Sequence, residues 1–117
     1  RAVPPLVTDG GRLTQLLTIL LQNALDHTPP GTPVELTLQP APGRLRLRVI
    51  DHGPGIPDDR KEQVFDRFFR ADASRTRKEN FGLGLSVARE LARGLGAALT
   101  LADTPGGGAT FTVDLPA

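Results

Sequence analysis

The sequence VIDHGPGIP, residues 49–57, places one aspartate and two glycines directly after an apolar segment. It predicts a strand that runs into a ligand pocket, because the carboxylate of Asp51 can accept a hydrogen bond from an amine. Gly53 and Gly55 have no Cβ atom, so the backbone can approach a flat ligand closely. Asp and Gly are also common at ordinary strand-to-turn junctions. The motif alone fits either a binding site or a structural turn, and the flanking sequence has to decide.

The residues before this motif predict a helix and a β-hairpin. Apolar residues recur at three- and four-residue spacing from about Gly11 to His27, which is typical of an amphipathic helix, and Asp9 is placed to cap it. Alternating apolar and polar residues then predict two strands, around residues 34–39 and 44–49. The arginines of the second strand are expected to face solvent or to lie along a partner strand.

The residues after the motif complete the predicted fold. A helix is expected to begin at Pro57, with Val64 and Phe65 on its apolar face. Residues 70–81 are polar and charged without a hydrophobic period, which predicts a mobile loop. A further helix is expected from Ser86 to Leu95, and a last hairpin from residues 97–102 and 109–115. This order predicts an α+β fold: a two-layer sandwich in which three helices cover one face of a mixed, mostly antiparallel sheet.

Length and composition limit the class of protein. The 117 residues suit a single domain with one core, and a chain that begins at Arg1 without methionine is expected to be a fragment of a longer protein. The absence of cysteine excludes disulfides and thiolate chemistry. A net charge of +1 argues against a nucleic-acid surface. No segment approaches the roughly 20 apolar residues that span a bilayer.

Further polar residues suggest where a charged ligand could bind. The amide oxygen of Asn23 can ligate Mg²⁺, although it also fits an exposed amide near a helix end. His27 can contact a ring or cap its helix. The glycines of residues 82–84 open a helix whose free N–H groups can bind phosphate, although they form neither a P-loop nor a dinucleotide-binding motif. The cations at Arg70 and at residues 75–78 suit either a loop over a triphosphate or a solvated surface.

Together these motifs resemble a known family. In order, they are LLQNALDHTP (20–29), DHGPGIP (51–57), VFDRFFR (64–70) and FGLGLSVA (81–88). They are similar to the N box, first glycine box, F box and second glycine box of the catalytic ATP-binding domain of sensor histidine kinases. The resemblance extends from Asp9 to the closing GGGATFTVDLP (106–116). It implies the Bergerat ATP-binding fold, which gyrase and MutL share.

The resemblance also implies roles for individual residues. Asn23 is expected to ligate Mg²⁺, Asp51 to accept the exocyclic amine of adenine, and Arg70 to reach the γ-phosphate; Asn23 and Arg70 are the expected catalytic residues. ATP and Mg²⁺ are the implied cofactors. The full set implied to bind the nucleotide is Asn23, His27, Asp51, Gly53, Gly55, Ile56, Arg70, Gly82, Leu83, Gly84, Leu85 and Thr110.

Three residues depart from the family pattern. Ile19 stands where the hydrolysing relatives have a glutamate base, which favours phosphoryl transfer to a nucleophilic acceptor over hydrolysis. Asp26 replaces a usual basic residue, and its carboxylate would repel phosphate unless it points away or meets an arginine. Asn80 stands where paired glycines are usual, and Asn tolerates left-handed backbone angles.

The implied function is that of a two-component sensor histidine kinase. The chain is expected to bind Mg·ATP and to donate the γ-phosphate to a histidine on a separate dimerisation domain of the same protein, which serves a response regulator. It would be the cytoplasmic part of a membrane-anchored sensor, monomeric alone and dimeric in the full protein. Neither His27 nor His52 resembles a phospho-acceptor, so the isolated chain is expected not to phosphorylate itself. The alternatives are an anti-sigma-type serine kinase and a docking module without productive ATP binding.

Overall fold

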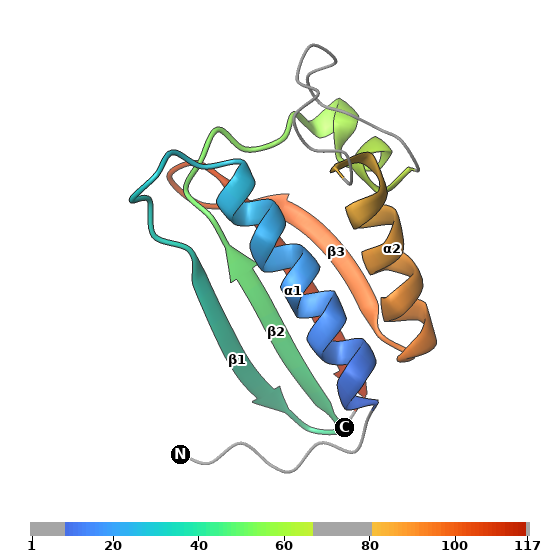
Figure 1. Cartoon of the computed structure of the whole chain (residues 1–117). Helices are drawn as coiled ribbons and strands as arrows, with labels where there is room; N and C mark the ends of the chain where they lie inside the picture. Colours follow the sequence, from blue (N-terminus) through green and yellow to red (C-terminus); the bar gives the residue numbers. More distant parts are fainter. Residues whose placement is uncertain (1–8, 67–80, 117) are drawn as a thin grey trace.

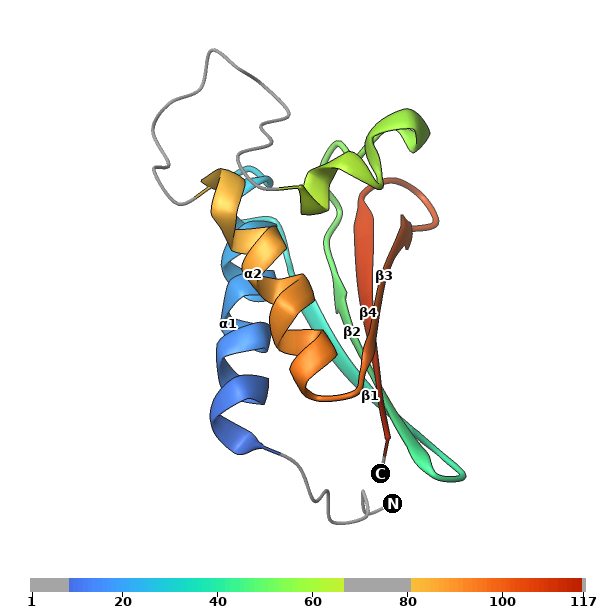
Figure 2. The same cartoon turned by 90° about the vertical axis from the view of Figure 1, so that its right-hand side faces the viewer.

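The computed structural model describes residues 9–66 and 81–116 (Figure 1). Two α-helices lie side by side on one face of a four-stranded sheet, as Figure 2 shows from the side. This arrangement confirms the predicted α+β sandwich. In chain order the elements are α1 (Gly10–Asp26), β1 (Glu35–Ala41), β2 (Arg44–Ile50), the 3-10 helices η1 (Asp58–Arg60) and η2 (Gln63–Phe65), α2 (Phe81–Gly94), β3 (Ala98–Asp103) and β4 (Ala109–Pro116).

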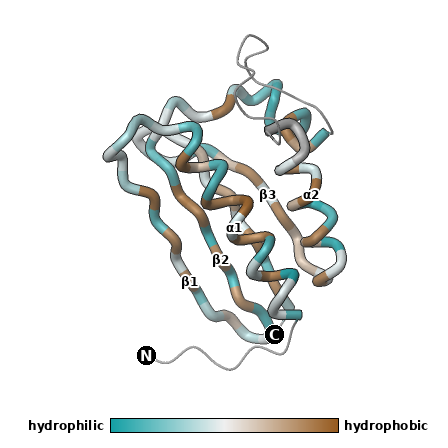
Figure 3. The backbone as a smooth tube through the Cα atoms, in the orientation of Figure 1, coloured by the Kyte–Doolittle hydropathy of each residue, from teal (hydrophilic) through white to brown (hydrophobic). Residues whose placement is uncertain are grey.

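The sheet has the strand order β1-β2-β4-β3, and each neighbouring pair is antiparallel. The two central strands, β2 and β4, show the expected alternation of buried and more exposed residues, because successive side chains of a strand point to opposite faces. Leu47 lies opposite Val113 and Val49 opposite Phe111, and all four are buried under the helices. Figure 3 shows the same alternation as brown and teal along the strands. The arginines of β2 lie on the other face, where Arg46 bonds Asp114 at 3.0 Å.

Helix α1 forms as its sequence predicts. The Asp9 side chain accepts a hydrogen bond from the backbone N–H of Arg12 at 3.1 Å, which satisfies one of the free donors of the first turn. Leu16, Leu20 and Ala24 are buried on the face toward the sheet. Each buried leucine contributes about 1.5–3 kcal/mol relative to an exposed one. In the described ranges, 9–66 and 81–116, no helix is both long and apolar enough to cross a membrane.

Two details differ from the predictions. The helix expected from Pro57 consists of two three-residue 3-10 helices, because the chain has no side-chain cap there and Val64 and Phe65 turn directly into the core. Helix α2 begins at Phe81, before the apolar stripe that predicted its start at Ser86. Apart from Phe81, the loop predicted over residues 70–81 lies outside the described residues.

Strand β1 is also less buried than its alternating sequence suggested. The register places Leu36 opposite Val49 and Leu38 opposite Leu47, on the face that carries the helices. Both leucines are nevertheless about half exposed, at 45% and 51%. The reason is their position, since β1 is the edge strand and lies beside α1 rather than beneath it (Figure 1).

Candidate functional site

A cavity lies at one end of the sandwich, where the loop after β2 passes between the sheet and the helices. Its walls come from α1, this loop, both 3-10 helices, α2 and β4, and most of the side chains are apolar. Such concave, mainly apolar sites with a few placed polar groups are typical of small-molecule binding. The lining residues are Asn23, His27, Asp51, Pro54, Gly55, Ile56, Pro57, Arg60, Val64, Leu85 and Ala109.

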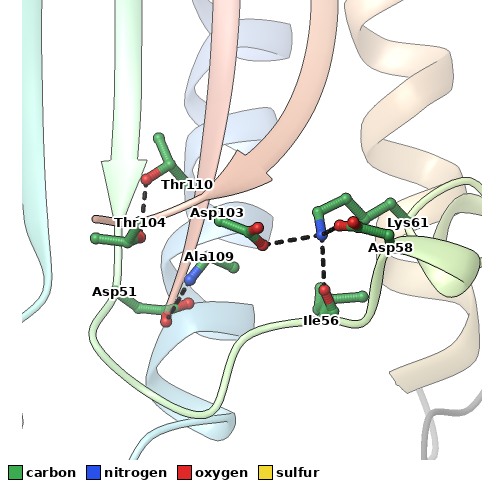
Figure 4. Close-up of polar contacts among 8 residues, drawn as sticks. All are labelled: Asp51, Ile56, Asp58, Lys61, Asp103, Thr104, Ala109 and Thr110. Atoms are coloured by element: carbon green, nitrogen blue, oxygen red, sulfur yellow. Dashed lines mark hydrogen bonds and ion pairs between the residues drawn. The ribbon is translucent and has the colours of Figure 1, made fainter. Parts of the chain in front are cut away.

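Asp51 is the buried acidic group of this cavity, with only 4% of its surface exposed. Its Oδ1 accepts two backbone N–H groups, those of Gly53 and Ala109, each at 3.0 Å. Figure 4 shows the bond from Ala109. The part of the chain that the structure describes offers no hydrogen bond to Oδ2, and it contains no fully buried side-chain oxygen without a partner. The carboxylate is therefore held through one oxygen, and the other remains an acceptor for a ligand in the cavity.

Two glycines make this geometry possible. A Cβ atom at Gly53 would lie 2.8 Å from the backbone oxygen of His27, so a side chain there would separate the loop from the end of α1. Gly108 has a φ of +117°, in the left-handed region, and a Cβ there would collide with the backbone oxygen of Asp51. The sequence analysis included Gly53 but missed Gly108, whose role depends on the turn before β4 closing on the end of β2.

The structure places Thr110 away from the cavity. Buried residues alternate with it along β4, so its side chain lies on the sheet face opposite the helices. There its hydroxyl lies 2.9 Å from the hydroxyl of Thr104 (Figure 4). Its neighbour Ala109 lines the cavity instead. The sequence predicts Thr110 as a binding residue, whereas the residue of this segment that lines the cavity is one position earlier.

His27 caps its helix, one of the two roles that the sequence left open, and it also lines the cavity. It is the C-cap residue of α1, and its Nδ1 lies 2.8 Å from the backbone oxygen of Asn23. At the same time its side chain belongs to the wall of the cavity. The hydrogen bond ties the ring to the helix end, so the imidazole is held in place at the cavity edge.

A second cavity adjoins the first between α1 and α2. Asn23 and Leu85 line both cavities, so the two are neighbours. The second is bordered by the first turns of α2, whose unpaired N–H groups favour anions. Ile19 and Asp26 also line it, and Asp26 accepts a hydrogen bond from Gln22 Nε2 at 3.1 Å. The complete lining is Thr18, Ile19, Gln22, Asn23, Asp26, Gly84 and Leu85.

Several predicted residues cannot be placed in this site. Arg70 and Asn80 lie outside the described residues, as do Phe68 and Phe69. Gly82 is in the first turn of α2, and the side chain of Leu83 is not described. Phe65 is buried as predicted, with its ring edge-on to Phe111 at 6.1 Å between centroids.

The sequence analysis missed one further charged residue beside the cavity. Lys61 Nζ donates to the backbone oxygen of Ile56 at 2.8 Å and to Asp58 Oδ1 at 2.6 Å. It also pairs with Asp103 Oδ1 at 2.9 Å (Figure 4). A lysine on a polar turn carries no sequence signal for such contacts, because Asp103 is distant in the chain.

Comparison with known proteins identifies the family of the chain. Residues 8–117 match the protein family described as histidine kinase-, DNA gyrase B-, and HSP90-like ATPase. The chain is 47% identical over 108 residues to the signal transduction histidine-protein kinase AfsQ2 of Streptomyces coelicolor. The matching region covers 92% of this chain and 20% of that protein. It spans about a fifth to a quarter of the length of such curated relatives.

Solved structures give the same result. The mycobacterial sensor histidine kinase MprB has a TM-score of 0.83 and 33% identity, over 95% of this chain and 76% of that one. Full-length ShkA in complex with AMPPNP has a TM-score of 0.81 and 31% identity, over 97% of this chain and 23% of that one. The fold and the sequence therefore lead to one family.

Proposed function

The chain belongs to the family of histidine kinase-, DNA gyrase B- and HSP90-like ATPases, and on this basis we propose that it binds ATP as the catalytic domain of a sensor histidine kinase. The observation that carries the proposal is Asp51, a buried carboxylate held through Oδ1 by two backbone N–H groups. The free oxygen accepts the exocyclic amine of adenine. The binding of AMPPNP by the related ShkA supports ATP as the nucleotide.

The first cavity takes the base. Ile56, Val64 and Leu85 offer apolar surface to the ring, while Asp51 supplies the polar contact that selects an amine. His27 borders the same space, with its ring fixed by the bond to Asn23. Apolar walls and one oriented acceptor suit adenine better than a base with a carbonyl at that position, because a carbonyl would face the carboxylate oxygen.

The second cavity takes the phosphates. The N–H groups at the start of α2 and the Asn23 amide lie on its two sides. The described residues contain no group of three or more His, Cys, Asp or Glu side chains that could hold a metal alone. Mg²⁺ usually takes few protein ligands beside nucleotide phosphates, so Asn23 fits as its protein ligand. When bound, Mg²⁺ supplies charge neutralisation at the phosphates.

The chain donates the γ-phosphate rather than hydrolysing ATP. Ile19 lines the phosphate cavity at the position where a glutamate base would activate water. A neutral imidazole is itself a nucleophile, so transfer to histidine needs mainly positioning and charge stabilisation. The acceptor histidine belongs to a dimerisation domain of the same protein, and a response regulator receives the phosphate. Arg70 reaches the γ-phosphate in this scheme, and the domain works on the cytoplasmic side of a membrane-anchored sensor.

Phosphoryl transfer in trans tests this proposal. The chain is incubated with labelled Mg·ATP, alone and with a purified dimerisation domain from the relative AfsQ2 or from the parent protein. Acid-labile, base-stable label is expected on the added domain and not on the chain itself. Label on a serine of a partner would indicate the anti-sigma type of kinase. The absence of ATP binding in a calorimetric titration would indicate a docking module and overturn the proposal.

A further inference from the structure

We propose that Lys61 is a positioning residue that fixes the wall of the adenine cavity by tying the loop of residues 54–57 to the end of strand β3. The inference rests on the proposed function, because it assigns a role within the same nucleotide site. Lys61 Nζ contacts three oxygens: the backbone oxygen of Ile56, Oδ1 of Asp58 and Oδ1 of Asp103. Figure 4 shows these three contacts converging on one nitrogen from three segments of the chain.

The number of contacts matches the chemistry of the group. A lysine ammonium has three N–H donors and no acceptor, and here each donor has one oxygen within 2.9 Å. The Lys61 side chain is only 18% exposed, whereas those of Asp58 and Asp103 are 90% and 69% exposed. Lys61 is therefore the enclosed centre of the cluster, and the carboxylates approach it from the solvent side.

The backbone of this loop makes few other hydrogen bonds within the described residues, although the Ile56 side chain packs against the core. Pro54 and Pro57 lack an N–H group. In the ranges 9–66 and 81–116, the backbone of residues 54–57 makes two hydrogen bonds, from Lys61 to Ile56 and from the Arg60 N–H to Pro57. The second is local to the turn. Among the described residues, the Lys61 bond is the hydrogen bond that connects this stretch, through Asp103, to the sheet.

The opposite end of the same segment is anchored separately. Glu62 pairs with Arg89 of α2 at 3.2 Å, and the Arg89 guanidinium lies 4.6 Å from the centre of the Phe65 ring. Phe65 is itself packed against Phe111. Loss of the Lys61 contacts therefore leaves η2 attached to the core, and it affects mainly the loop that forms the cavity wall.

The charge of Lys61 is maintained by its partners. The hydrogen bonds to Asp58 and Asp103 raise the pKa of Lys61, and the bond from Lys61 lowers the pKa of Asp58. Both groups remain ionised throughout the neutral range. The cluster is consequently a permanent part of the site near neutral pH and not a switch.

The test is nucleotide affinity of the Lys61→Met variant of the chain, which keeps the aliphatic stem and removes the donors. Calorimetric titration is expected to show about three- to ten-fold weaker binding of both ATP and ADP, because the loop then becomes ordered only on binding and the free energy of ordering it reduces the affinity. The two losses should be equal, since the wall contacts the base and not the γ-phosphate. Hydrogen exchange at the Arg60 amide, which donates to the Pro57 oxygen, should become faster, with the Val113 amide unchanged.

Two further variants complete the design. Arg93→Met removes another cation of an i,i+3 pair, with Glu90 at 2.8 Å on the exposed side of α2, and it should leave both affinities unchanged. Asp103→Ala removes only the acceptor on the sheet. It should weaken binding in the same direction, and the double variant should bind no more weakly than Lys61→Met alone.

The possible results are distinguishable. If the unmodified chain binds no ATP, the proposed function fails. If the unmodified chain binds ATP and Lys61→Met binds it equally well, the positioning role is refuted. Additive losses of affinity in the double variant would also refute it, because they would show that Lys61 and Asp103 do not act through one shared contact. Should Lys61→Met unfold, Asp103→Ala alone decides, and unchanged affinity there overturns the inference.

Discussion

Replacement of Asp51 by asparagine should distinguish the role of this residue in nucleotide affinity from its role in the stability of the fold. The carboxylate currently accepts two N–H groups through Oδ1 and offers Oδ2 to the cavity. An amide has one oxygen and one NH₂ group. If its oxygen keeps the backbone bonds to Gly53 and Ala109, the NH₂ group faces the cavity and opposes the amine of adenine. If the amide turns over, the NH₂ group opposes the backbone N–H groups instead, and stability falls.

The magnitude follows from the burial of the site. A buried donor or acceptor left without a partner costs about 1–3 kcal/mol, and Asp51 is 4% exposed. In the first orientation this cost appears in binding, as a loss of ATP affinity of about 5- to 150-fold. In the second orientation it appears in the free energy of unfolding. Urea denaturation and calorimetric titration of the same sample therefore show which orientation is adopted.

A comparison of bases sharpens the assay. Inosine triphosphate carries a carbonyl oxygen where ATP carries the amine, so the amide NH₂ of Asp51→Asn can donate to it. The variant should lose ATP affinity while keeping or gaining inosine triphosphate affinity. Asp114→Asn is the matched control, because Asp114 pairs with Arg46 on the far face of the sheet. Equal losses for the two nucleotides, or an ATP affinity and a free energy of unfolding that are both unchanged, would refute the assignment of Asp51 to the amine.

Two other predictions concern stability. Gly108→Ala should lower the free energy of unfolding by at least about 1–3 kcal/mol, the usual cost of a strained backbone, because its Cβ would collide with the Asp51 carbonyl. Urea denaturation measures this change. As the control, Gly10→Ala lies in open space on α1 and should change the free energy of unfolding by no more than about 1 kcal/mol. The Lys61–Asp58 contact should stabilise the fold at pH 7 and not in acid, because Lys61 lowers the pKa of Asp58. The contribution of this contact to stability is present above the ordinary pKa of an aspartate, and it is lost as the pH falls through the lowered pKa of Asp58. The stability difference between the unmodified chain and Lys61→Met should then shrink in strong acid, and a difference that stays constant with pH would contradict the pairing.

Local sequence features were sufficient for most of the fold. The α1 cap at Asp9 and the apolar spacing of its helix are set within a few residues, and both were predicted correctly. The alternation in β2 and β4 was equally readable, because one buried face imposes a period of two. Edge position is different. Leu36 and Leu38 have the sequence of a half-buried strand, yet their exposure depends on which strand α1 crosses, and that is a property of the assembled sandwich.

The site could be predicted only in part for the same reason. Asp51 and Gly53 are adjacent in the sequence, so their motif was recognisable. Gly108 and Ala109 join them through the β2–β4 register, with the Asp51 N–H bonded to the Ala109 oxygen at 2.9 Å. No local pattern specifies that pairing or distinguishes Ala109 from Thr110 as the residue beside the cavity. Lys61 was missed because its partner Asp103 is brought near only when β3 takes its place at the sheet edge.

The cavity walls come from α1, the loop after β2, α2 and β4, and this has a consequence for how the protein responds to heat. No smaller unit of the described chain contains the whole cavity, so a nucleotide binds the folded chain and not the unfolded one. Ligand binding of this kind raises the melting temperature according to its concentration. Thermal shift with a panel of nucleotides would thus report the selectivity of the site directly, with no acceptor domain and no chemical step.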